Sequence, residues 1–228
     1  MAWIAGVRSS LHSSVGSIVF GMEDGVVSIF GLVFGVSIAA PNSHAVWLAG
    51  ATGAAAAAVS MMAGTYLDVE STNDQALARL AHETHRYYKS HQEVEEAVRS
   101  HLIAAGFDHS EATTVIGIYA AHPATWIKVQ AAVDLGVAEA SRQSPLLEAS
   151  WMFLADLLAA AVPVLPFAFL DLAFARFISL VLTLLLVIAL GVGRSRVGGR
   201  RLMPTVAETI GIAAAAAGAG VLVGKVIA

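Results

Sequence analysis

The feature that most constrains the fold is a set of five apolar segments, each long enough to cross a lipid bilayer. A transmembrane helix needs about 20 consecutive apolar residues to cross roughly 30 Å of hydrocarbon. Charged residues make up only 13% of the 228-residue chain, against about 25% in soluble domains. The sequence therefore predicts an all-α integral membrane protein with five transmembrane helices, at Val15–Ile38, Ala45–Tyr66, Leu146–Phe169, Ala173–Val192 and Thr205–Ile227.

A charged segment separates the second and third spans and holds six of the eight histidines. Its apolar residues recur with a helical period, and Gly106, Pro123 and Gly136 interrupt the pattern, so three or four short helices are expected there. The predicted organisation is a transmembrane hairpin (1–70), a helical, metal-binding-like insert (71–145) and a transmembrane part with spans three to five (146–228).

The distribution of arginine predicts the orientation in the membrane. The loop GVGRSRVGGRRL between spans four and five carries four arginines, whereas the short loops APNSHA and FLDL carry no lysine or arginine. The positive-inside rule places the arginine-rich loop in the cytoplasm. Counting back through the spans, the N-terminus and the insert should also be cytoplasmic, and the C-terminus should lie on the far side.

The composition excludes several classes of protein. With no cysteine, the chain can form no disulfide, thiolate metal site or cysteine nucleophile. The net charge is −4 and no Lys/Arg-rich tract is present, so nucleic acid is not an expected partner. No Walker A phosphate loop occurs, which argues against an ATP-driven pump.

Two adjacent acids, Glu23 and Asp24, lie within the first apolar segment. A carboxylate in hydrocarbon costs about 2.5 to 3.5 kcal/mol on insertion scales, so such acids usually face a protein interior, a water-filled cavity or a cation. Asp24 is therefore a candidate metal ligand. Glu23 is adjacent to Asp24 and therefore points to a different side of the helix. It is expected to face a partner helix, the cytoplasmic mouth or the metal. Other acids in or beside the spans are Glu148, Asp156 and Glu208.

The second span carries a sulfur atom and a carboxylate on one helix face. Met61, Thr65 and Asp68 are spaced four and three residues apart, which aligns them on a helix. A thioether suits a first-row transition ion better than Mg²⁺ or Ca²⁺, and carboxylates accept any of these ions. Met61 and Asp68 are thus candidate ligands, with core packing as the alternative for Met61.

The insert contains a second group of candidate ligands. The motif HETH spaces His82 and His85 three residues apart, and HQEVEE spaces Glu93 and Glu96 in the same way. Imidazole and carboxylate without thiolate suit Fe²⁺, Mn²⁺, Co²⁺ or Zn²⁺. The alternative is that these charged residues form only a solvated helix surface.

Several segments, in the same order along the chain, resemble the vacuolar iron transporter family. IVFGMEDGVVSIFGLVFGV resembles the family's first-span pattern, VFGxxDGLV followed by GLVxGV, and AVSMMAGTYLDVESTND resembles its second-span ending, SMxxGEYxSxxSQ. AAGF and AHPATWIKVQAAVDLGV resemble its RGL and HPxxxxxxxxxELGL segments, and PVLPF resembles the motif that closes its third span. Thr65 replaces the acid of the second-span pattern, and Lys128 stands in a helix that is usually rich in Glu and Met.

The resemblance implies a homodimer of five-span subunits that moves Fe²⁺, and in some members Mn²⁺, out of the cytosol in exchange for protons. The membrane would be vacuolar in a eukaryote and the plasma membrane in a prokaryote. The pathway residues carry over to Asp24 and Met61, and the metal-gathering glutamates carry over to Glu83, Glu93 and Glu96. Asp134 stands where the ELGL segment has glutamate.

The sequence thus predicts a proton-coupled secondary transporter rather than an enzyme, with no tightly bound cofactor and Fe²⁺ or Mn²⁺ as the transported ion. Zn²⁺ and Co²⁺ remain chemically suitable. Two alternatives stay open. One is a metal-sensing or structural membrane protein without flux. The other is a membrane-bound di-iron oxidase, which would use Glu-x-x-His pairs on facing helices, and the sequence contains no such pair.

Overall fold

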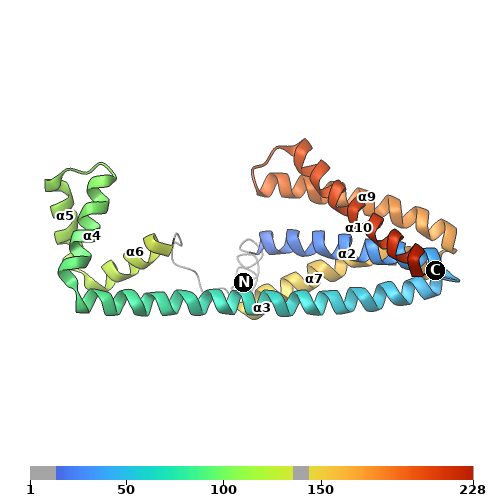
Figure 1. Ribbon diagram of the computed structural model, residues 1–228, viewed down its shortest axis with the longest axis horizontal. Helices are drawn as coiled ribbons and strands as arrows, with labels where there is room; N and C mark the ends of the chain where they lie inside the picture. Colours follow the sequence, from blue (N-terminus) through green and yellow to red (C-terminus); the bar gives the residue numbers. More distant parts are fainter. Residues whose placement is uncertain (1–13, 136–143, 228) are drawn as a thin grey trace, which may run out of the picture. The chain divides into compact units, whose positions relative to one another are not determined.

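The computed structural model describes residues 14–135 and 144–227, apart from the side chains of residues 130–135. The chain divides into two compact units: a membrane unit, Met1–Leu67 with Ser144–Ala228, and an insert unit, Asp68–Gln143. The regular structure of the described ranges is helical (Figure 1). The helices are α2 (Val15–Ala39), α3 (Ser43–Lys89), α4 (His91–Ala104), α5 (His109–Ala120), α6 (Pro123–Leu135), α7 (Pro145–Val164), α8 (Pro166–Phe169), α9 (Leu172–Val197) and α10 (Leu202–Ile227).

Five helices, α2, α3, α7, α9 and α10, are long and apolar enough to cross a membrane. This confirms the predicted class, a multi-pass all-α membrane protein with a helical insert. One boundary differs from the expectation: α3 is a single helix of 47 residues that includes both the second span and the first insert helix. Because the segment from Thr65 to Lys89 contains no glycine or proline, nothing in it interrupts helical hydrogen bonding.

Helix α2 is the central element of the membrane unit, and it packs against α7, α9 and α10 (Figure 1). Small residues allow these close contacts. A Cβ added at Gly31 would lie 2.8 Å from the backbone oxygen of Ala216, and one added at Gly35 would lie 2.5 Å from the backbone oxygen of Gly220. Gly31 and Gly35, four residues apart on α2, therefore let the backbones of α2 and α10 approach without intervening side chains.

Prolines and one arginine shape the end of the membrane unit at which α2 and α7 finish and α9 begins. Pro163 lies near the end of α7, which gives way to the short helix α8 at Pro166. The hydroxyl of Ser179 on α9 donates a hydrogen bond to the backbone oxygen of Pro163 at 2.8 Å. The Arg176 guanidinium donates to Oγ of Ser37 at 3.2 Å and also to its backbone oxygen. Arg176 thus satisfies a carbonyl in the last turn of α2, where a cation is favourable.

The insert unit has its own small core. Tyr87 at the end of α3, Val94 of α4, Ile116 of α5, and Trp126 and Ile127 of α6 are buried together. The N-terminus of α5 is fixed by a capping box, in which Asp108 accepts from the Glu111 backbone N–H and Glu111 accepts from the Asp108 backbone N–H. The insert helices are therefore held by packing and by local hydrogen bonds.

Candidate metal site

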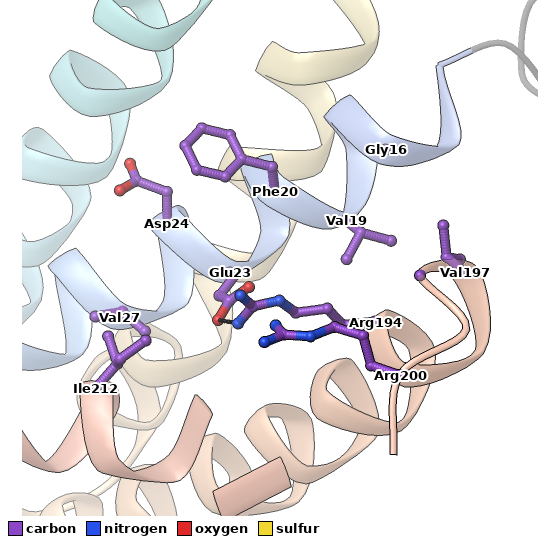
Figure 2. A pocket seen from close by; sticks show the side chains of 11 residues that line it. Gly16, Val19, Phe20, Glu23, Asp24, Val27, Arg194, Val197, Arg200 and Ile212 are labelled. Carbon is purple, nitrogen blue, oxygen red and sulfur yellow. Dashed lines mark hydrogen bonds and ion pairs between the residues drawn. The ribbon is translucent and has the colours of Figure 1, made fainter. Parts of the chain in front are cut away.

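Glu23 and Asp24 line a cavity of about 450 Å³ in the membrane unit. The cavity lies between α2 and the end of α9 with the connection that follows it; Arg194 of α9 and Arg200 of the connection contribute to its wall. Figure 2 shows Glu23 directed toward the two arginines, whereas Asp24 extends from α2 in a different direction. Adjacent positions on a helix point about 100° apart, because 3.6 residues complete a turn. The two acids therefore have different surroundings.

Glu23 is held by an ion pair. Its Oε1 lies 3.1 Å from Nη1 of Arg194, and the two side chains are 15% and 29% exposed. Arg194 also lies 3.3 Å from Glu208, which in turn lies 3.2 Å from Arg200. These four residues form one charged network at the wall of the cavity. Because Arg194 neutralises Glu23, no metal ion is required to balance the charge of this carboxylate within the membrane unit.

Asp24 has no such partner. It is half-buried on α2, and within the described ranges no side chain forms a hydrogen bond or ion pair with it. A carboxylate in this environment has unused ligand capacity, since an ionised carboxylate offers about four lone-pair positions. Asp24 is therefore a predicted ligand, within the membrane unit, that the structure leaves available.

A polar column on α7 was not anticipated from the sequence. Ser17 of α2 donates a hydrogen bond to Oε1 of Glu148 at 2.6 Å. One turn further along both helices, a Cβ added at Gly21 would lie 2.5 Å from Sδ of Met152. The contact pairs advance by four residues on each helix, so α2 and α7 run in the same direction and pack in a constant register.

The next contact in this register brings Asp156 against Gly25. A Cβ added at Gly25 would lie 2.5 Å from Oδ1 of Asp156. Asp156 is fully buried, at 0% exposure, and neither of its carboxylate oxygens has a hydrogen-bond partner in the described part of the chain. Asp24 immediately precedes Gly25, so it lies on α2 beside this contact. The spacing of Glu148, Met152 and Asp156, four residues apart in an apolar helix, is the sequence signal for this column.

The two predicted ligands on α3, Met61 and Asp68, belong to different units. Met61 is half-buried and is absent from the cavity's described lining. Asp68 is exposed and is the first residue of the insert unit. Both residues lie on one continuous helix, and Met61 does not line the cavity with Asp24.

Most of the predicted insert ligands are exposed, Glu83 is half-buried, and several of them are paired. Nδ1 of His82 is 3.3 Å from Glu83, which is also 3.7 Å from Arg86, while His85 is exposed. In α4, Glu93 is exposed, and Glu96 lies 3.3 Å from Arg99. Asp134 lies outside the described residues as far as its side chain is concerned. No group of three or more His, Asp or Glu side chains that could hold a metal ion occurs in the part of the chain that the structure describes.

Comparisons with known proteins identify the family. The model of the VIT family matches residues 15–225. Vacuolar iron transporter 1 of Arabidopsis thaliana is 26% identical, over 93% of this chain and 86% of its own length. Vacuolar iron transporter 2 of Oryza sativa subsp. japonica is 28% identical, over 93% of this chain and 87% of its own, and vacuolar iron transporter 1 of Eucalyptus grandis is 28% identical, over 78% and 72%. The family match covers nearly the whole chain, and the chain therefore belongs to the VIT family.

Proposed function

We propose that this protein is a secondary transporter that moves Fe²⁺ out of the cytosol, with Asp24 as the ligand within the membrane. The observation that carries the proposal is the state of Asp24, a half-buried acid on a membrane-spanning helix that lines a cavity and has no partner in the described structure. Such acids mark ion pathways. Relatives that are named vacuolar iron transporters support iron as the ion, and Mn²⁺ is the second candidate because it accepts the same ligands.

Exchange of metal for protons is part of the proposal. A carboxylic acid must lose its proton before it can coordinate a metal ion, so metal binding at Asp24 releases one proton. If Asp24 faces one side of the membrane at a time, this residue can carry a metal ion outward and a proton inward. Alternation between two conformations that bind the metal with different affinity is then sufficient for coupling.

The orientation and the role of the insert complete the proposal. A cytoplasmic position of the α9–α10 connection is supported by the positive-inside rule, since Arg194, Arg196, Arg200 and Arg201 lie in or beside it. The N-terminus and the insert unit then face the cytosol, and the insert collects metal through His82, Glu83, His85, Glu93 and Glu96. The transporter acts as a homodimer, in a vacuolar membrane or a plasma membrane according to the organism.

The test is Fe²⁺ uptake into proteoliposomes made with purified protein, with and without a pH gradient. The parent should accumulate Fe²⁺, and an acidic interior should accelerate uptake. Asp24→Asn keeps the shape of the side chain and removes its charge, so it should abolish uptake while the protein stays folded. Asp171→Asn, at an exposed acid in the same unit, is the matched control and should transport like the parent.

Two outcomes would reject the proposal. If the parent binds metal but produces no flux under any gradient, the protein is a sensor or a structural protein. If Asp24→Asn transports as fast as the parent, the acid is structural and the pathway lies elsewhere.

A further inference from the structure

Asp156 is the most unusual buried group in the described part of the membrane unit. Its residue exposure is 0%, and both carboxylate oxygens lack a hydrogen-bond partner. Burial removes the hydration of a carboxylate, and proteins normally compensate with hydrogen bonds, an opposite charge or a metal ion. The described residues supply neither a hydrogen bond nor an opposite charge to Asp156.

The packing around Asp156 leaves room for its carboxylate and brings a second carboxylate near it. Gly25 has no side chain, and its backbone lies directly against Oδ1 of Asp156. Asp24 immediately precedes Gly25 on α2, so its carboxylate is attached beside this contact and carries the same charge as Asp156. Two carboxylates of like charge repel each other, and a cation between them would convert this repulsion into attraction. The pair therefore has the chemistry of an oxygen-ligand site for a divalent cation.

We propose that Asp156 is a second ligand of the transported ion, so that α2 and α7 of one subunit hold a divalent transition-metal ion between Asp24 and Asp156. This inference rests on the proposed transport function. Met152 lies one turn before Asp156 on the same face of α7, and its sulfur packs against Gly21. A thioether at this position favours Fe²⁺ over Mg²⁺ or Ca²⁺ as the ion that approaches the two carboxylates.

The first measurement is metal binding by the full-length protein in detergent, with Mn²⁺ as the probe and electron paramagnetic resonance as the readout. Parent, Asp156→Asn, Asp24→Asn and the double variant are compared. Each single substitution should weaken Mn²⁺ binding at this site at least tenfold, and the double variant should be no weaker than the worse single variant, because both remove the same ion. Metal bound by the insert is common to all four proteins and does not change the comparison.

A matched control and a second substitution protect the test against misfolding. Thr183 has a buried hydroxyl oxygen that also lacks a partner in the described structure. Thr183→Val removes this polar group and should leave Mn²⁺ affinity unchanged. Asp156→Ala removes the buried carboxyl together with its desolvation cost, so it should fold at least as well as the parent. Metal should raise the unfolding temperature of the parent and raise that of Asp156→Ala less.

The second measurement is the concentration dependence of Fe²⁺ uptake. The half-saturating Fe²⁺ concentration should rise at least tenfold in Asp156→Asn. If the parent transports Fe²⁺ and both Asp156 variants bind Mn²⁺ and take up Fe²⁺ like the parent, Asp156 is not a ligand and the inference is overturned. If the parent shows no uptake, the proposed function fails, while the binding comparison still decides whether Asp24 and Asp156 share an ion.

Discussion

Gly25 of α2 lies directly against Asp156 of α7, with no side chain between the α2 backbone and the buried carboxylate. The contact belongs to a constant register, in which Ser17 meets Glu148 and Gly21 meets Met152. Glycine is required at this point because any β-carbon would overlap the Asp156 carboxylate and backbone. The same closeness places Asp24 beside a second acid.

The first prediction concerns this contact. Gly25→Ala should destabilise the membrane unit by about 1 to 3 kcal/mol, because the new methyl group overpacks a rigid backbone contact. Thermal unfolding of the purified protein in detergent measures the effect. Gly211→Ala, on α10 with nothing within 4 Å of the added carbon, is the control and should change stability little. Equal unfolding temperatures for the two variants would show that α2 and α7 are not in close contact.

The ion pair between Glu23 and Arg194 gives the second prediction. Since Arg194 neutralises Glu23, Glu23→Gln should reduce Fe²⁺ uptake far less than Asp24→Asn does. Arg194→Gln should impair uptake more than Glu23→Gln, because it leaves both Glu23 and Glu208 without their shared partner. Initial uptake rates of the three variants decide the point. A complete loss of uptake in Glu23→Gln alone would instead make Glu23 a metal ligand.

Met61 on α3 provides a test of ion selectivity. Met61→Leu keeps an apolar side chain of similar volume and removes the sulfur, so it should raise the half-saturating concentration for Fe²⁺ more than that for Mn²⁺. The adjacent Met62 is half-buried to a similar degree, and Met62→Leu is the control that should preserve the ratio. The two half-saturating concentrations are measured in proteoliposomes. If neither substitution changes the ratio, Met61 is a packing residue.

The insert residues are predicted to act in capture rather than in translocation. Replacing His82, Glu83, His85, Glu93 and Glu96 together by Ala should raise the half-saturating Fe²⁺ concentration severalfold and lower the maximal rate much less. The control replaces two other exposed insert residues, Asp74 and His109, by Ala. An unchanged concentration dependence in the fivefold variant would identify these residues as a solvated surface.

The last prediction tests the orientation with single cysteines, which the chain lacks in its own sequence. Pro41 and Arg201 are both exposed and belong to connections at opposite ends of the spans. In sealed vesicles, a membrane-impermeant maleimide should label Arg201→Cys from the cytoplasmic side and Pro41→Cys from the other side. Labelling of Pro41→Cys from the cytoplasmic side would reverse the proposed topology.

The sequence by itself determined the architecture at the level of spans. Apolar segments of sufficient length form helices in a bilayer because every backbone N–H and C=O group must be satisfied within the segment. The five spans, the charged insert between the second and third, and the location of Asp24 within the first span were therefore predictable. The continuity of α3 was also encoded locally, in a segment without glycine or proline after Gly64.

Tertiary structure decided which side chains meet. The pairing of Glu23 with Arg194 joins residues 171 positions apart, and helical periodicity carries no information about such a contact. Asp156 was visible as an acid in an apolar span, but its burial against Gly25 depends on the register between α2 and α7. That register is selected by how glycines, a methionine and two carboxyl groups fit across two helix surfaces, and this fit exists only when the helices are packed.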